Sequence, residues 1–496
     1  MGFYINLLQI KYWCLNLLPM PANSWPENES YKEVESLNSS LSETSEPEEL
    51  AEETLSSMFH PSQFQRRRGK AAIVLIAIWS CTIALHLVSW GYLFVLGLTT
   101  IMGLYVFLVV FTKPGNTKVI QGDLPDLNLP FVSVLVAAKN EEAVIGNLVK
   151  NLCNLDYPEN KYEVWIIDDN SSDNTSVVLT EMSHQFDNLK VLTRSPQAGG
   201  GKSGALNQVL PLTQGEIVAV FDADAQVSSD LLLHIVPMFK SENVGAVQVR
   251  KAIANASYNF WTKGQMAEMA LDTYFQEQRV SLGGIGELRG NGQFVRRKAL
   301  HRCGGWNEET ITDDLDLTFR LHLDNWDIKS VFYPAVQEEG VTKTISLWHQ
   351  RNRWAEGGYQ RYLDYWQLLA KNRMGTRKTW DMLVFMLFMY ILPTAAVPDL
   401  LMALICHRLP VLAPMTSVTI TLSTVAMFAG LRRTYKHKSL TFSDYLLFLL
   451  QTLRGTLYML HWFVVMSSTT ARMSVRPKKL KWVKTIHQGH SSYQIR

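Results

Sequence analysis

Apolar runs long enough to cross a bilayer stand on both sides of a central region in which short apolar runs alternate with helical windows. Before that region, residues 71–89 and 93–111 are almost entirely apolar, and each has about the 20 residues that a crossing helix needs. Trp90 and Tyr92, between the two runs, suit the membrane interface. The pattern predicts a transmembrane hairpin over residues 71–111.

After the central region, residues 382–466 contain three more apolar runs, at 382–405, 411–431 and 445–466. The first two predict a second hairpin, in which Asp399 is expected at a helix end, in a polar cavity or paired inside the bundle. The third run carries Arg454 near its centre, where a charge is costly. A crossing there would also leave the basic tail at 467–496 outside. The sequence therefore leaves open whether residues 382–466 form two or three transmembrane helices. If they form two, the last run is interfacial or re-entrant.

Charge is unevenly distributed, although the formal net charge is only +2. Residues 27–53 hold ten glutamates and one lysine among polar residues, so residues 1–65 are expected to form a disordered acidic region. The basic residues at 66–70 predict a cytosolic N-terminus, to which the hairpin returns the chain. Nothing indicates nucleic-acid binding. The five scattered cysteines form no CxxC pair, which argues against a disulfide framework and a zinc site.

Residues 125–380 show the pattern of an α/β domain. Short β-rich runs alternate with helical windows, at residues 131–137, 163–168, 190–193 and 217–221. Near-continuous apolar strands are typical of a parallel sheet that is covered on both faces, and the alternation predicts right-handed crossovers. Ligands of such sheets bind beyond the carboxyl ends of the strands.

Paired aspartates follow two of these predicted strands. Asp168 and Asp169 close the second strand, where two adjacent acids exceed what a turn or a helix cap needs. Asp222 and Asp224 follow the fourth strand, and their spacing sends both carboxylates toward one side. Hard oxygen ligands of this kind suit Mg²⁺ or Mn²⁺. A DxD sequence is common by chance, so its specificity lies in its position at a strand end.

Other polar motifs supply candidates for an acid–base group and for cations. Asp313 and Asp314 open a predicted helix, where acids favour the helix dipole, and Asp314 is the candidate for a general base acting on an acceptor hydroxyl. The glycine-rich segment around Lys202 lacks the GxxxxGK[ST] spacing of an ATPase loop. Lys202 is instead expected near a diphosphate or a nucleotide base.

Gln350, Arg353 and Trp354 form a QxxRW sequence in a helical window that precedes the second membrane region. The simplest interpretation is a basic interfacial helix with a tryptophan anchor. Because the aspartate motifs come before it, we prefer an interpretation in which this helix places a cation and an aromatic ring beside the reacting groups.

In their order along the chain, these motifs resemble those of glycosyltransferase family 2, the inverting GT-A group that includes cellulose, chitin and hyaluronan synthases. The resemblance covers about residues 131–361. It implies a GT-A (Rossmann-like) catalytic domain, a nucleotide-linked donor sugar, usually carried on UDP, and a divalent metal. The third motif is Thr-Asp-Asp here rather than the commoner Thr-Glu-Asp, a conservative departure that keeps Asp314 in place.

The resemblance also implies a role for each motif. Asp169 would contact the uracil, and Asp314 would act as the base. Asp222 and Asp224 would hold the metal and, through it, the diphosphate. The rest of the donor and acceptor regions is expected to be lined by Asp168, Lys202, Asp313, Gln350, Arg353 and Trp354.

Within the family, the acidic region, the first hairpin and the segments at 290–293 and 350–358 resemble the members that glucosylate diacylglycerol. This implies a multi-pass membrane enzyme, with its catalytic domain on the cytosolic face, that uses Mg²⁺ and moves glucose from UDP-glucose to the sn-3 hydroxyl of 1,2-diacylglycerol. A processive polysaccharide synthase shares every motif, although four or five crossings leave little material for a polymer channel. A non-catalytic membrane scaffold is the third possibility, and the retention of all the motifs argues against it.

Overall fold

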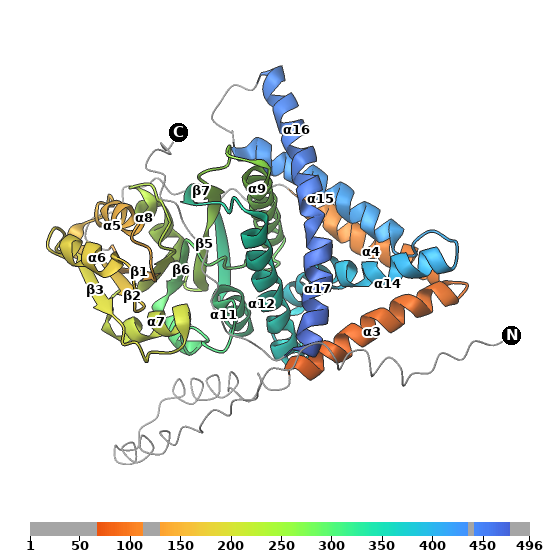
Figure 1. Ribbon diagram of the computed structural model, residues 1–496, viewed down its shortest axis with the longest axis horizontal. Helices are drawn as coiled ribbons and strands as arrows, with labels where there is room; N and C mark the ends of the chain where they lie inside the picture. Colours follow the sequence, from red (N-terminus) through yellow and green to blue (C-terminus); the bar gives the residue numbers. More distant parts are fainter. Residues whose placement is uncertain (1–66, 113–128, 435–440, 477–496) are drawn as a thin grey trace, which may run out of the picture. The chain divides into compact units, whose positions relative to one another are not determined.

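The computed structural model describes residues 67–112, 129–434 and 441–476. The predicted acidic region at residues 1–65 lies outside the described residues, as does the basic tail beyond residue 476. The described part consists of an α/β domain built on one sheet and of helices that precede and follow it in the sequence (Figure 1).

The sheet has seven strands in the order β3-β2-β1-β4-β6-β5-β7. Their bounds are β1 (Val132–Ala138), β2 (Tyr162–Asp168), β3 (Leu189–Thr193), β4 (Ile217–Phe221), β5 (Val244–Ile253), β6 (Gln293–Arg296) and β7 (Asp327–Glu338). β1 to β4 pair in parallel, and β6 is antiparallel to both β4 and β5. The four predicted strands and the α/β class are therefore confirmed, while β5, the short antiparallel β6 and β7 were not predicted.

Both faces of the sheet are covered because its strands are apolar on both sides. One face packs against α5 (Ile145–Cys153), α6 (Thr175–Ser183) and α8 (Leu231–Ile235). The opposite face packs against α7 (Gly201–Val209), α10 (Arg297–Arg302) and α11 (Asp313–Leu323). Each fully buried Val, Leu or Ile of these layers contributes about 1.5–3 kcal/mol of transfer free energy. The two layers hold the carboxyl ends of the strands in a fixed arrangement.

Four helices in the described part of the chain are long and apolar enough to cross a membrane. They are α3 (Arg67–Leu87), α4 (Gly91–Phe111), α15 (Ala413–Thr434) and the continuous segment Thr376–Ile405, which joins α13 (Thr376–Met386), the π-helix Leu387–Ile391 and α14 (Leu392–Ile405). The third C-terminal apolar run is instead divided at Leu460 between α16 (Phe442–Met459) and α17 (His461–Val475), neither of which belongs to the four.

Long helices of the α/β domain contact these membrane helices. α9 (Phe260–Ser281) packs against α15 and α16, and α12 (Thr344–Ala370) packs against α17. α17 in turn packs against α3 and α14. In Figure 1, α9, α12 and the α16–α17 pair stand between the sheet and the membrane helices. The divided third run therefore contacts both the α/β domain and the candidate membrane helices.

Two of the charged residues that the sequence placed at or inside the membrane helices, Arg67 and Asp399, have charged or titratable partners. Arg67, part of the basic cluster that we expected to precede the first helix, lies within α3, and its guanidinium binds both carboxylate oxygens of Asp364 in α12. This ion pair is buried, so Arg67 ties the hairpin to the domain as well as adding positive charge. Asp399 lies 2.7 Å from Nε2 of His86 and accepts a hydrogen bond from the N–H of Val411. The expectation that Asp399 is paired inside the bundle is confirmed.

Candidate functional site

The carboxyl ends of three neighbouring strands meet at one edge of the sheet. β1 lies between β2 and β4, and the register pairs Ala138 with Asp168 on one side and Val136 with Phe221 on the other. Asp222 directly follows Phe221. The two predicted aspartate motifs therefore flank the end of β1, at the edge where parallel sheets bind their ligands.

The segment that precedes β6 reaches the same edge from the opposite direction. Gln293, the first residue of β6, pairs with Val220 of β4. Two residues earlier, the fully buried Asn291 accepts a hydrogen bond from the N–H of Asp222 at 3.2 Å and donates to the carboxylate of Glu338 at 3.4 Å. The antiparallel strand thus holds the DxD segment in place against β7.

A cluster of cations faces Asp222. Nζ of Lys202, in the first turn of α7, lies 2.6 Å from Oδ1 of Asp222. Burial alone would raise the pKa of Asp222, but Lys202, Lys251 and Arg353 outweigh it and lower that pKa. Asp222, Asp313 and Asp314 in turn raise the pKa of Lys202 against the effect of its own burial. Five segments of the chain therefore share one electrostatic site: α7, the residue that follows β4, β5, α11 and α12.

Asp313 and Asp314 open α11, as predicted. Burial, followed by repulsion from Asp313, raises the pKa of Asp314 to about 6. Oδ1 of Asp314 accepts a hydrogen bond from the N–H of Leu315, and a Cβ on Gly290 would lie 3.4 Å from its Oδ2. A carboxyl group with such a pKa can take up a proton near neutral pH, as a general base must.

The QxxRW residues lie on α12, as the helical window predicted. Burial lowers the pKa of Arg353, and Asp222, Asp314 and Asp313 oppose that shift, so Arg353 belongs to the same electrostatic site. Lys251 lies 5.3 Å from the ring centre of Trp354. Oε1 of Gln350 is buried and finds no hydrogen-bond partner in the described residues.

Asp168 and Asp169, although adjacent, have different surroundings. Asp168 is fully buried, and its carboxylate accepts hydrogen bonds from the N–H of Ser171 and the hydroxyl of Ser176, which hold the turn before α6. The carboxylate of Asp169 is partly exposed and binds Nη1 of Arg194 at 2.5 Å. Lys139 lies 3.8 Å from the same carboxylate. Donor binding by either aspartate stays a prediction, and Asp169 is the one with an accessible carboxylate.

Asp222 pairs with Lys202 of the cationic cluster, and Asp224 follows it by two residues. Oδ2 of Asp224 accepts a hydrogen bond from the N–H of Glu339, which fixes its side chain. No group of three or more His, Cys, Asp or Glu residues suited to a metal occurs among the described residues. Mg²⁺ is often held by only one or two carboxylates together with substrate phosphates and water. Asp222 and Asp224 therefore fit a metal that binds together with a diphosphate.

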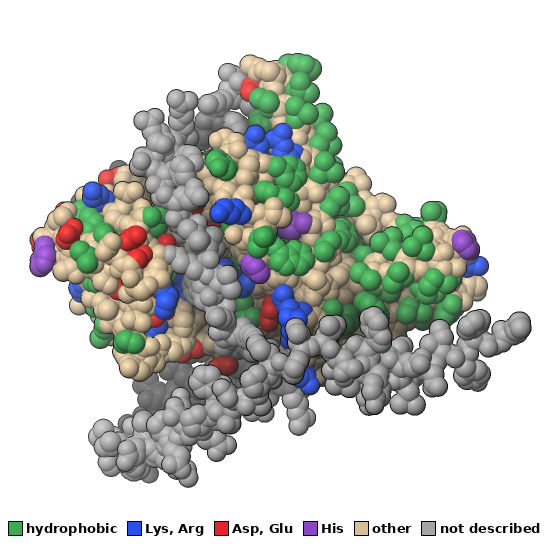
Figure 2. All heavy atoms as spheres, in the orientation of Figure 1, with side chains coloured by type: hydrophobic (Ala, Val, Ile, Leu, Met, Phe, Trp, Pro, Cys, Tyr) green, Lys and Arg blue, Asp and Glu red, His purple; other side chains and the backbone are tan. Residues whose placement is uncertain are grey.

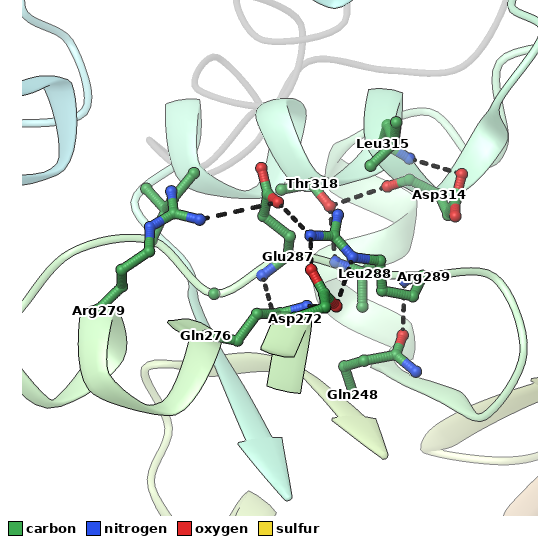
Figure 3. Close-up of polar contacts among 12 residues, drawn as sticks. Gln248, Asp272, Gln276, Arg279, Glu287, Leu288, Arg289, Asp314, Leu315 and Thr318 are labelled. Atoms are coloured by element: carbon green, nitrogen blue, oxygen red, sulfur yellow. Dashed lines mark hydrogen bonds and ion pairs between the residues drawn. The ribbon is translucent and has the colours of Figure 1, made fainter. Parts of the chain in front are cut away.

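A buried ion network lies behind Asp314 (Figure 3). Glu287 is completely buried, and its two carboxylate oxygens bind Arg361 at 2.8 Å and Arg289 at 2.7 Å. Arg289 also binds Asp272 of α9 at 2.7 Å. Burial would raise the pKa of Glu287, but the arginines outweigh it and hold that pKa well below its ordinary value.

The same network reaches the membrane helices. Arg279 of α9 lies 3.8 Å from Glu287 and binds the carboxylate of Asp381 in α13 at 2.9 Å. The hydroxyl of Tyr105 in α4 donates to Asp381 at 2.8 Å. A chain of buried contacts thus connects the segment beside Asp314 with two predicted membrane spans.

Several of these charged residues were not predicted from the sequence. Lys251 stands near the end of a strand and Arg194 directly after one, a position that could have marked both as candidates. Glu287 carries no such signal, because its partners Arg279 and Arg361 come from distant helices.

Comparison with known proteins identifies the family of this chain. The family profile described as glycosyltransferase like family 2 matches residues 130–357. A β-monoglucosyldiacylglycerol synthase of Trichormus variabilis is 70% identical over 95% of this chain and 99% of the relative. A protein of the same name from Synechocystis is 52% identical over 94% of this chain and 97% of the relative.

A solved structure resembles the fold. The mannosyltransferase from Pyrobaculum calidifontis, determined in complex with GDP-Man and Mn²⁺, has a TM-score of 0.50 and 18% identity, and the match covers 79% of this chain and 99% of that chain. The seven-stranded mixed sheet is thus of the GT-A type. With relatives that match over nearly their full length, the chain belongs to glycosyltransferase family 2.

Proposed function

We propose that this chain transfers glucose from UDP-glucose to the sn-3 hydroxyl of 1,2-diacylglycerol and forms the β-glucoside. The observation that carries the proposal is the convergence of Lys202, Asp222, Asp314 and Arg353, from four separate elements, on one charged site. The names of relatives that match over nearly the whole chain supply the identity of the sugar and of the lipid.

Asp314 is proposed to remove the proton from the acceptor hydroxyl as that oxygen attacks C1 of the sugar. Attack on the face opposite the leaving UDP inverts the configuration in a single displacement. Lys202 and Arg353 offset the negative charge that builds on the diphosphate, the type of electrostatic contribution that is usually the largest in catalysis. Asp222 and Asp224 would hold a divalent cation, for which we propose Mg²⁺, and that cation would neutralise the diphosphate further.

The remaining motif residues are assigned to the two substrates. Asp169, with its partly exposed carboxylate beside Arg194, is proposed to contact the uracil. Asp168 shapes the turn that presents Asp169. Gln350 and Trp354 are proposed to line the acceptor side of the site, with Asp313 next to the base.

We further propose that the protein crosses the membrane several times with its catalytic domain on the cytosolic face. The four apolar helices support several crossings. The orientation is supported by the basic residues at 66–70 and by Arg432 and Arg433 at the end of α15, because cytosolic segments carry an excess of Lys and Arg. A lipid acceptor would then reach the site from the cytosolic leaflet.

The test is incubation of membranes that contain the protein with labelled UDP-glucose, diacylglycerol and Mg²⁺, followed by separation of the lipid products. A parallel incubation with UDP-galactose establishes the donor, and membranes with Asp314→Asn serve as the matched control. A lipid that carries one glucose supports the proposal. A polymeric product would indicate a processive synthase, and the absence of any transfer would indicate a scaffold.

A further inference from the structure

Arg351 lies inside the QxxRW sequence but is not one of its named residues, and its surroundings are unusual. The side chain is almost completely buried, at 1% exposure. Its Nη2 binds the carboxylate of Glu268 in α9 at 2.5 Å and the hydroxyl of Tyr458 in α16 at 3.0 Å. The guanidinium carbon lies 4.0 Å from the ring centre of Trp354. Arg351 therefore connects the tryptophan of the motif with two neighbouring helices.

Glu268 is held from a third direction as well. The indole N–H of Trp462 in α17 donates to its Oε1 at 2.8 Å, and the hydroxyl of Tyr458 donates to its Oε2 at 3.1 Å. Arg351 also lies 5.7 Å from the ring centre of Trp462. The charge of the guanidinium is thus compensated, and its orientation is fixed by aromatic and acidic side chains.

This arrangement leaves buried hydrogen-bonding groups unused. Nε and Nη1 of Arg351 find no hydrogen-bond partner among the described residues, and the same is true of Nε2 of His461. His461 packs against Tyr458 with 4.6 Å between the ring centres, so these groups belong to one cluster. Buried polar groups are almost always paired. Two unused donor nitrogens on one fixed arginine therefore point to a ligand that supplies an acceptor oxygen.

The cluster lies beside an apolar helix face. α16, which supplies Tyr458, exposes a row of large apolar side chains and packs against the membrane span α15, so its outer face continues the apolar surface of the membrane helices (Figure 2). The row comprises Leu446, Leu447, Leu449, Leu450, Leu453 and Leu457. On its other side, the cluster contacts Trp354 of the candidate active site.

We propose that Arg351 binds an ester carbonyl oxygen of the diacylglycerol acceptor through Nε and Nη1. Because Glu268 already compensates its charge, a neutral carbonyl suits this arginine better than a phosphate does. The ester groups share one glycerol with the sn-3 hydroxyl, so holding a carbonyl at Arg351 positions that hydroxyl beside Trp354. The inference rests on the proposed function and names the group by which the acceptor is recognised.

The experiment compares diacylglycerol with its dialkyl ether analogue, which keeps the sn-3 hydroxyl but lacks the ester carbonyls. We expect the full-length wild-type protein to prefer the diacyl lipid by about tenfold in kcat/KM, the size of one hydrogen bond to a charged donor. Arg351→Gln should bring this ratio close to one while the KM for UDP-glucose stays unchanged. Arg351→Lys, which keeps the charge but not the paired donors, should do the same.

Arg472→Gln is the matched control. Arg472 also joins α17 to α12, through Asn352 and Glu356, but its nitrogens are not among the buried unpaired atoms. This variant should keep the wild-type ratio. Equal use of both lipids by the wild-type protein, or an unchanged ratio in both Arg351 variants, would overturn the inference alone. Failure of the wild-type protein to glucosylate either lipid would overturn the proposed function as well.

Discussion

Nζ of Lys202 lies 2.6 Å from Oδ1 of Asp222, so the ammonium group at the start of α7 pairs with the carboxylate that follows β4. The field of Lys202 also reaches Asp313 and Asp314. Carboxylates brought together in one site raise one another's pKa, whereas a nearby cation favours their ionised forms. Lys202 therefore influences the charge of both a proposed metal ligand and the proposed base.

The pH dependence of activity should report the state of Asp314. Its pKa is raised to about 6, and a base works only when it is deprotonated. We expect kcat/KM to be constant above that pH and to fall as the pH decreases through about 6, because Asp314 then becomes protonated. The measurement is glucosyl transfer as a function of pH at subsaturating donor. A profile that stays flat through this range would assign the base elsewhere.

The acidic limb of the pH profile is the fall in kcat/KM through about pH 6, and two substitutions should shift it in opposite directions. Lys202 lowers the pKa of Asp314, so Lys202→Met should shift the limb to higher pH. Asp313 raises the pKa of Asp314, so Asp313→Asn should shift it to lower pH. The other charged groups around this site, Lys251, Arg289 and Arg353, are unchanged in both variants. Shifts of the same sign would contradict this electrostatic assignment.

Replacing the proposed base should slow the chemical step without weakening donor binding. Asp314→Asn should lower kcat by about 10²–10⁴-fold, the usual contribution of a general base. Its affinity for UDP should remain close to that of the wild-type protein, as measured by equilibrium binding in detergent. Asp169→Asn should behave in the converse way, weakening UDP binding. If Asp314→Asn loses UDP binding instead, its carboxylate serves the donor and not the acceptor.

Activity should require a divalent cation. Treatment with a chelator should abolish transfer, and Mg²⁺ should restore it, because the diphosphate leaves with a charge that Asp222 and Asp224 can offset only through a cation. Asp224→Asn should raise the Mg²⁺ concentration needed for half-maximal activity. Asp230→Asn, a substitution of a half-exposed aspartate paired with His234, is the control and should leave that concentration unchanged.

The positions of Asp222 and Asp314 in the fold could be predicted from the sequence, for a physical reason that applies to each residue. Asp222 and Asp314 follow or begin regular elements, so periodicity and the strand-end rule locate them. Asn291 and Glu287 could not be found in this way. Their roles depend on an antiparallel strand of four residues and on ion pairs between distant helices, and neither leaves a periodic trace in the sequence.

The third apolar run shows a similar limit. Hydrophobicity, Arg454 and the basic tail left residues 445–466 open between a crossing helix and an interfacial or re-entrant segment. The division at Leu460 and the contacts of α16 and α17 with α9 and α12 depend on side chains such as Tyr458, which pair across those helices. Sequence periodicity does not contain that information.

The buried network around Glu287 should dominate the stability of the junction between the catalytic domain and the membrane helices. Glu287→Gln leaves Arg289 and Arg361 without their common carboxylate, and breaking a buried pair in this way costs roughly 3–5 kcal/mol. Thermal unfolding in detergent should therefore occur at a clearly lower temperature. Asp327→Asn is the matched control, because Asp327 is half exposed and pairs with Lys378 near the surface. An exposed pair contributes at most about 1 kcal/mol, so equal unfolding temperatures for the two variants would show that the network does not hold the junction together.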